Sequence, residues 1–155
     1  MIGREDKFKS EKSLVRKLID KSTFTRIPLP KVAKRINDTL RYTYLVSENN
    51  YAAALESVQY HFEKSGYVIS KIFNAWELEQ TPEDSGYRGV NITVISSQKQ
   101  KFELQLHTVA SFALKTETHG LYDEFRNPNT SETRKAEISD IVKEKAKKLK
   151  RPKGI

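Results

Sequence analysis

Polar and apolar side chains alternate strictly along residues 101–108, Lys-Phe-Glu-Leu-Gln-Leu-His-Thr. A period of two residues predicts a β-strand whose two faces meet different surroundings. One face is apolar and would pack into a core, and the other carries Glu103, Gln105 and His107. In an isolated strand such a row is most often a solvated sheet face. The polar groups elsewhere in the chain favour a phosphate-handling site instead.

The hydrophobic patterns of the remaining chain predict helices and strands in mixed order. Helices are predicted at about residues 12–21, 31–36, 49–64, 109–125 and 131–149, and strands at 40–46, 67–76, 90–95 and 101–108. This order predicts an α/β (α+β) fold, with a small mixed β-sheet flanked by helices. Neither an internal repeat nor a domain boundary is evident. Residues 1–155 are therefore predicted to form one domain, with a basic C-terminal helix and tail from about residue 131.

Charge and composition narrow the class of partner. The 155 residues carry a net charge of +8, which favours an anionic partner such as a nucleotide, a nucleic acid or an acidic protein. The sequence contains no cysteine, which excludes disulfides and thiolate metal sites. No apolar run is long enough to cross a bilayer, and no signal-peptide core opens the chain. We expect a soluble protein without a membrane partner.

Cations gather around the first predicted helix. Ser13 and Lys17 lie four residues apart and share one helical face, and Lys7 and Lys9 precede them. Such a row is usually a solvated surface, but lysines also suit the binding of a triphosphate.

Two further features could serve nucleotide chemistry. Asp38 and Arg41 stand at the start of a predicted strand, where an Asp is often a turn former but could also hold Mg²⁺ beside phosphates. Tyr87 follows Gly86 in a predicted loop, where its ring is either packed or offered to a base. Base stacking on such a ring is worth about 1–3 kcal/mol.

Together these motifs resemble the synthetase domain of the RelA/SpoT alarmone synthetases, over about residues 7–122. That domain transfers the terminal pyrophosphate of ATP to the 3′-hydroxyl of a guanine nucleotide. The matched positions are Lys7, Lys9, Ser13 and Lys17 in the opening motif, Asp38 and Arg41 in the metal-binding motif, Gly86 and Tyr87 in the Gly-Tyr motif, and Glu103 and Gln105 in the Glu-x-Gln motif. No single motif is specific, but their order and spacing are.

The resemblance implies an enzyme, a nucleotide pyrophosphokinase, with a role for each matched residue. Asp38 and Glu103 would hold Mg²⁺, and Glu103 would also accept the acceptor's hydroxyl proton. Gln105 and His107 would orient Glu103 or contact phosphate. Tyr87 would stack on the acceptor base, with Asn91 beside it. Phosphate contacts are expected from Lys7, Lys9, Ser13, Lys17, Arg41, Arg88, His107 and Lys115.

Four positions depart from the family pattern. Lys7 replaces an Arg, Glu83 replaces the Lys before Gly-Tyr, Asn91 replaces a His and His107 replaces an Arg. The variants resemble the toxin and effector branch of the family, in which some members use adenine acceptors or RNA ends. This branch implies action in the bacterial cytoplasm, delivery as the C-terminal domain of a secreted or phage-associated protein, and a cognate immunity protein.

The acceptor therefore remains open among guanine nucleotides, adenine nucleotides and the 3′-end of tRNA. The carboxylate of Glu83 accepts from amino groups and repels carbonyl oxygens, which favours adenine slightly. The same loop could instead turn Glu83 into solvent.

Three other interpretations compete with pyrophosphate transfer. A nucleic-acid-binding module would fit the net charge, although the aromatic residues lie mostly on apolar stripes. An ADP-ribosyltransferase-like toxin would need a Gln-x-Glu or Glu-x-Glu strand, whereas Glu103 and Gln105 stand in the reverse order. A zinc site built from His61, His107 and His119 lacks suitable spacing.

Overall fold

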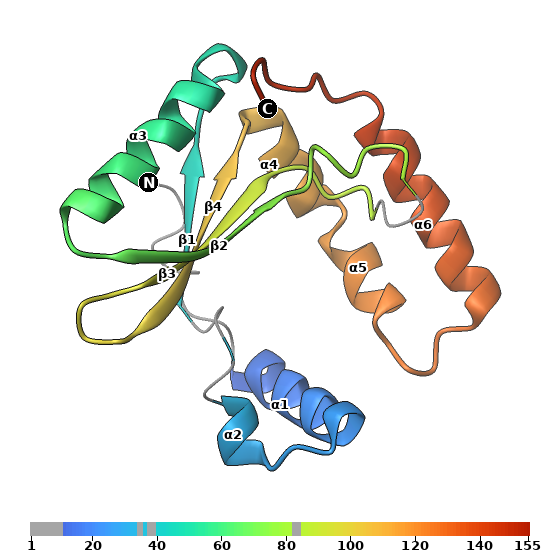
Figure 1. Ribbon diagram of the computed structural model, residues 1–155. Coiled ribbons are helices and arrows are strands. Elements are labelled where there is room, and N and C mark those ends of the chain that lie inside the picture. The colour runs from blue at the N-terminus through green and yellow to red at the C-terminus, as the bar shows by residue number, and fades with distance from the viewer. Residues whose placement is uncertain (1–10, 34–35, 37–39, 82–84) are drawn as a thin grey trace. The chain divides into compact units, whose positions relative to one another are not determined.

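The structure is a computed structural model that describes residues 11–33, 36, 40–81 and 85–155 (Figure 1). Its helices are α1 (Glu11–Thr25), α2 (Leu29–Ala33), the 3₁₀ turn η1 (Glu48–Asn50), α3 (Tyr51–Lys64), α4 (Val109–Glu117), α5 (His119–Phe125) and α6 (Glu132–Ala146). Its strands are β1 (Arg41–Leu45), β2 (Val68–Asn74), β3 (Val90–Ile95) and β4 (Lys101–His107). The predicted small mixed sheet flanked by helices is confirmed.

The four strands form one sheet in the order β1-β4-β3-β2. β1 and β4 run parallel, because the amide of Glu103 bonds to the carbonyl of Leu40 and that of Val46 bonds to the carbonyl of His107. β3 and β4 form an antiparallel hairpin closed by the bond from Ser96 N to the Gln100 carbonyl. The last strand of the sequence therefore lies inside the sheet.

Side chains are buried on both faces of β4. On the apolar face Leu104 and Leu106 are buried, and on the polar face Gln105 is 3% exposed and His107 is 0% exposed. Glu103 is half-buried, with 15% of its side chain exposed. The polar row of β4 is therefore not a solvated sheet face. Buried polar side chains need hydrogen-bond partners, and the chain supplies them.

The chain groups into two compact units, and each unit is made of segments that are separated in the sequence. The first comprises Met1–Tyr44, Gln59–Ile72 and Ile92–Gln105, and the second comprises Leu45–Val58, Phe73–Asn91 and Leu106–Ile155. The expected single domain stays a prediction.

The first unit holds an aromatic cluster on β1, α3 and β4. Phe102 contacts Tyr42, Phe62 and Tyr67 at ring-centroid distances of 5.8, 5.9 and 6.1 Å, mostly edge to face. Within the same unit α1 packs against α2. The short second helix begins at Leu29, two residues before the predicted start, because Pro30 is compatible with the first turn of a helix.

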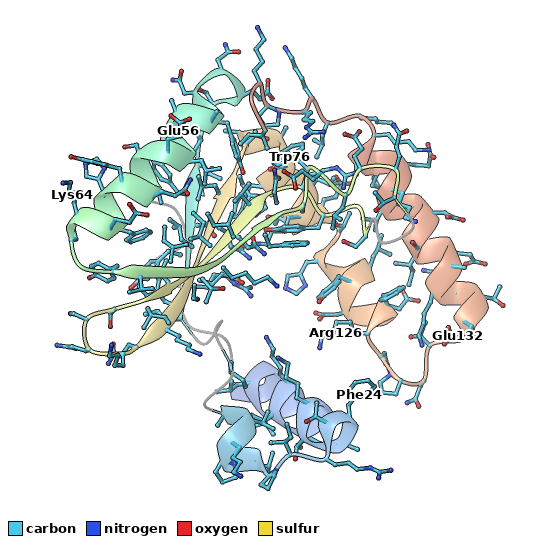
Figure 2. All side chains as sticks on the ribbon, in the orientation of Figure 1. Phe24, Glu56, Lys64, Trp76, Arg126 and Glu132 are labelled. Carbon is cyan, nitrogen blue, oxygen red and sulfur yellow. The ribbon has the colours of Figure 1, made fainter. Side chains whose placement is uncertain are left out.

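The second unit is built around the only tryptophan of the sequence. Trp76, which follows β2 (Figure 2), is 1% exposed and lies edge to face against Tyr51 at 6.3 Å between ring centroids. Ile138 of α6 is also buried in this unit, and α6 packs against α4 and α5.

The predicted single helix over residues 109–125 is wrong. The structure has α4 and α5, separated at Thr118, whose hydroxyl donates to the Leu114 carbonyl at 2.8 Å. The predicted cap of the last helix is confirmed, because the Ser131 side chain accepts from the Arg134 amide at 3.2 Å. That helix ends at Ala146, three residues before the predicted end.

Candidate active site

The first cluster of predicted site residues lies in the first unit, where β1 and β4 are neighbours. The guanidinium Nε of Arg41 donates to Glu103 Oε1 at 2.8 Å. Gln105, two residues further along β4, donates from Nε2 to the same oxygen at 2.8 Å. The parallel register places Arg41 beside Glu103, and the strand period places Gln105 on the same face. The structure thus brings together three of the predicted residues.

Arg41 and Gln105 both donate to one oxygen of the carboxylate and not to the other. Among the residues that the structure describes, Oε2 of Glu103 has no hydrogen-bond or ion-pair partner. A half-buried carboxylate oriented through one oxygen can offer the other to a metal ion or a proton. Glu103 therefore has the geometry expected of a metal ligand or a general base.

The donor set fits Mg²⁺ only as a site shared with a substrate. Mg²⁺ is usually held by one or two carboxylates together with phosphate oxygens and water. Glu103 supplies one carboxylate, and the predicted second, Asp38, lies outside the described residues. Within the described part of the chain, no group of three or more His, Asp or Glu side chains could hold a metal by itself.

The second cluster lies in the second unit, around the residue predicted to stack on the acceptor base. The Tyr87 hydroxyl donates to Asn91 Oδ1 at 2.7 Å and lies 3.0 Å from His107 Nε2. The Tyr87 and His107 rings meet edge to face, with centroids 5.3 Å apart and planes at 86°. Tyr87 is half-buried. The predicted residues Tyr87, Asn91 and His107 are thus brought together.

His107 connects this cluster to the start of α4. Its Nδ1 lies 3.0 Å from the hydroxyl oxygen of Ser111, one helical turn further on. Ser111 and Thr108 form a capping box, in which each side-chain oxygen accepts from the other residue's backbone amide at 3.0 Å. Ser111 was not among the predicted site residues. The Thr-x-x-Ser spacing after a predicted strand is the signal that could have found it.

Two glycines let the Tyr87 loop approach its neighbours closely. A Cβ on Gly86, whose φ is +74°, would lie 2.6 Å from Val142 Cγ1 of α6. A Cβ on Gly89 would lie 2.8 Å from the His107 ring. Both distances are shorter than ordinary contacts, so these positions of the loop accept only glycine without a shift.

A buried tyrosine holds the end of the same loop. The hydroxyl of Tyr51 accepts from the amide of Val90 at 3.2 Å and donates to the carbonyl of Leu106 at 2.6 Å. Burial raises the pKa of Tyr51 to about 12, despite the opposing effect of hydrogen bonds to the phenolate. The neutral phenol therefore links the start of β3 to β4.

The other predicted phosphate ligands that the structure describes lie on several different elements. Arg88 is 3% exposed and donates from Nη1 to the Tyr87 carbonyl at 2.9 Å. The ammonium of Lys115 lies 5.5 Å from the centre of the Phe112 ring. Lys17 is half-buried on α1, and Ser13 belongs to the same helix. Lys7, Lys9 and Glu83 lie outside the described residues, so their predicted roles stay predictions.

Two of the three histidines of the zinc interpretation, His61 and His119, have other neighbours. His119 Nδ1 lies 3.3 Å from Asp123 on an exposed part of α5. His61 packs edge to face on Tyr60, with centroids 5.5 Å apart.

Across the described residues, no helix is long and apolar enough to span a membrane.

Comparison with solved structures places the fold. Small alarmone synthetase 1 from Bacillus subtilis, bound to its product pppGpp, matches 90% of this chain over 69% of its own, with 17% identity and a TM-score of 0.59. A GTP pyrophosphokinase family protein from Streptococcus pneumoniae matches 90% of this chain over 66% of its own, with 17% identity and a TM-score of 0.57.

A third match comes from a complex of the Type VI effector Tas1 with its immunity protein. It covers 92% of this chain and 79% of the matched chain, with 16% identity and a TM-score of 0.51. No protein-family model and no curated protein sequence matches the chain. The fold is that of the RelA/SpoT-like synthetases, as the motifs implied.

Proposed function

We propose that the chain is a Mg²⁺-dependent pyrophosphokinase, which transfers pyrophosphate from ATP to the 3′-hydroxyl of a purine nucleotide. The observation that carries the proposal is the Glu103 carboxylate, held through one oxygen by Arg41 and Gln105. The fold supports the same conclusion, because proteins described as alarmone synthetases and as a GTP pyrophosphokinase share it.

The proposed step exchanges one phosphorus–oxygen bond for another. The acceptor's 3′-oxygen bonds to the β-phosphorus of ATP, the bond from that phosphorus to the α,β-bridging oxygen breaks, and AMP leaves with that oxygen. Glu103 takes the hydroxyl proton on Oε2. Because Arg41 and Gln105 fix Oε1, the carboxylate does not have to reorient before it accepts the proton.

Charge neutralisation is the second requirement of phosphoryl chemistry. Glu103 and Asp38 would hold Mg²⁺ here, and the bound ion would supply positive charge that offsets the charge of the phosphates. The proposed phosphate contacts are Lys7, Lys9, Ser13, Lys17, Arg41, Arg88 and Lys115, as the family resemblance implies. His107 is left out of this set, because its side chain is 0% exposed and its ring nitrogens contact Tyr87 and Ser111.

The acceptor is proposed to bind against Tyr87. Its ring is half-buried and fixed at the hydroxyl end, which lowers the entropic cost of presenting it to a base. Stacking by itself does not select a base, so both guanine and adenine nucleotides remain candidate acceptors.

A toxin role in the bacterial cytoplasm is proposed on a different ground. The fold is shared with the Tas1 effector, which was crystallised with an immunity protein. The same likeness supports a cognate immunity protein as a partner and delivery from another cell.

The test incubates the protein with γ-labelled ATP and separate pools of GDP, GTP, AMP, ADP, ATP and tRNA. We expect a labelled pyrophosphorylated purine nucleotide and an equal amount of AMP, with both products absent when Mg²⁺ is chelated. Label on tRNA alone would identify an RNA-modifying enzyme instead. ATP breakdown without any labelled acceptor would overturn the proposal.

A further inference from the structure

The hydrogen bonds around Tyr87 have a definite direction. A tyrosine hydroxyl has one proton, and Tyr87 gives it to Asn91 Oδ1 at 2.7 Å. The contact of 3.0 Å with His107 Nε2 must then be donated by the imidazole. A neutral imidazole that carries its proton on Nε2 has an acceptor at Nδ1.

Ser111 completes the same direction. Its hydroxyl oxygen accepts the Thr108 amide at 3.0 Å, and its own proton can go to His107 Nδ1 at 3.0 Å or to the Thr108 carbonyl at 3.3 Å. The shorter contact serves the imidazole acceptor. The relay therefore runs from Ser111 through His107 and Tyr87 to Asn91.

We propose that His107 and Ser111 are positioning residues for the acceptor, which act through this relay on Tyr87 and Asn91. The inference rests on the proposed function for the identity of the ligand. His107 is 0% exposed and Ser111 is 2% exposed, so neither side chain offers its polar atoms to a solvent-borne substrate. Their hydrogen bonds instead hold the Tyr87 hydroxyl in place. The hydroxyl in turn orients the ring on which the base would stack.

The relay also sets which group Asn91 presents. Because Oδ1 accepts from Tyr87, the NH₂ group of the same amide points away from it. That NH₂ group has no hydrogen-bond partner among the residues that the structure describes, and Asn91 is half-buried. Asn91 is therefore a donor, directed at an electronegative atom of the acceptor nucleoside.

Close packing keeps the relay in one arrangement. Gly89 lets the His107 ring approach its backbone, where a Cβ would lie only 2.8 Å from the ring. Phe112 meets the same imidazole, with ring centroids 5.9 Å apart. A tightly packed imidazole cannot turn over without moving its neighbours.

The first arm of the test separates the hydroxyl of Tyr87 from its ring. Tyr87→Phe keeps the stacking surface and removes the hydroxyl that takes part in the relay, so we expect the acceptor KM and Kd to rise about 5- to 10-fold, the value of one hydrogen bond. The KM for ATP and kcat should change less than twofold. Tyr60→Phe, an exposed tyrosine on α3, is the control that leaves all three values unchanged.

The second arm separates the relay from helix capping. Ser111→Ala and Thr108→Ala each remove half of the capping box and should lower stability alike. Only Ser111→Ala removes the group that holds His107 Nδ1. We expect a raised acceptor Kd in Ser111→Ala and an unchanged one in Thr108→Ala.

A third arm tests the direction of the relay. Asn91→Asp keeps an oxygen for Tyr87 and replaces the donor by a second oxygen, so the acceptor Kd should rise at least as much as in Tyr87→Phe. The ¹⁵N spectrum of the wild type should show His107 protonated on Nε2 alone. Protonation on Nδ1 alone would overturn the direction.

Acceptor Kd values come from calorimetry with GDP and ADP in the absence of ATP, so they do not depend on turnover. If the wild type transfers pyrophosphate while Tyr87→Phe and Ser111→Ala bind acceptors as tightly, the relay is refuted and the function stands. If these variants weaken nucleotide binding but no transfer occurs, the function fails and the relay stands. A wild type that binds neither nucleotide overturns both.

Discussion

At the scale of single residues, the proposed reaction depends on the Glu103 carboxylate, whose two oxygens have different surroundings. Glu103 Oε1 takes two donors, whereas Oε2 has none among the described residues. This asymmetry separates orientation from chemistry, because the first oxygen fixes the group and the second is available to react.

Glu103→Gln should therefore lower pyrophosphate transfer by more than about 100-fold, the usual scale for a positioned acid–base or electrostatic group. The amide cannot take a proton or ligate a metal as a carboxylate does. Glu56→Gln, at an exposed position of α3 (Figure 2), is the matched control and should keep full activity. An active Glu103→Gln protein would remove Glu103 from the reaction.

Two glycine-to-alanine substitutions are expected to change the stability in opposite directions. Gly89→Ala places a Cβ 2.8 Å from the His107 ring and 3.0 Å from the Leu106 carbonyl oxygen, so it should destabilise by about 1–3 kcal/mol. Gly120→Ala meets nothing within 4 Å in α5 and should stabilise by about 0.5–1 kcal/mol, because alanine favours a helix.

Urea unfolding followed by Trp76 fluorescence measures both changes, because this tryptophan is the only one and is buried. Equal stabilities of Gly89→Ala and the wild type would show that the loop can move away from His107.

At the scale of elements, sequence patterns predicted the helices and strands well where local signals decide them. Gly66, with φ at +74°, ends α3 as expected, and Ser131 caps α6. The division at Thr118 was not predictable, because threonine is no helix breaker and its bond back to Leu114 depends on the fold.

The polar face of β4 was predicted, but its burial was not. Alternation shows which residues share a face, whereas the burial of that face depends on what packs against the sheet. The central place of β4 comes from pairing between distant segments, such as Leu40 with Glu103. For the same reason, the sequence patterns could not predict which side chains Arg41 and His107 contact. Only the family resemblance indicated that these residues belong to the site.

A forked ion pair joins α5 to α6. Arg134 donates from Nε and Nη2 to the two oxygens of Glu124, at 2.8 and 3.1 Å. These hydrogen bonds hold the pKa of Glu124 below its ordinary value of 4.5. A lowered carboxyl pKa contributes stability above pH 4.5, which is lost as the pH falls through the folded-state pKa.

The Tm difference between the wild type and Glu124→Gln should therefore be largest near neutral pH and shrink below pH 4.5. High salt should reduce it, because the pair is exposed to solvent. Differential scanning calorimetry from pH 3 to 7 measures the effect. A difference that stays constant through pH 4.5 would show that the ion pair does not contribute.

At the scale of the whole molecule, the proposed activity has a consequence for any bacterium that makes the protein. Continuous consumption of ATP and of a purine acceptor would arrest growth. We expect induced expression of the wild type in a bacterial host to be toxic and that of Glu103→Gln, produced at the same level, to be harmless. Colony counts after induction, with soluble protein confirmed in both cultures, make the comparison. Normal growth despite active wild-type protein would argue against the toxin role.

The sheet order also bears on the moment at which a nascent chain acquires this activity. Within the described part of the chain, β1 has only β4 as a sheet neighbour, and Arg41 meets Glu103 across 62 positions of sequence. While residues 101–107 are still in the ribosome, β1 has no strand to pair with and the carboxylate is not yet part of the chain. An interrupted translation product that ends before this point would be inert in the proposed reaction, so a producing cell would be exposed to that reaction only after β4 has been synthesised.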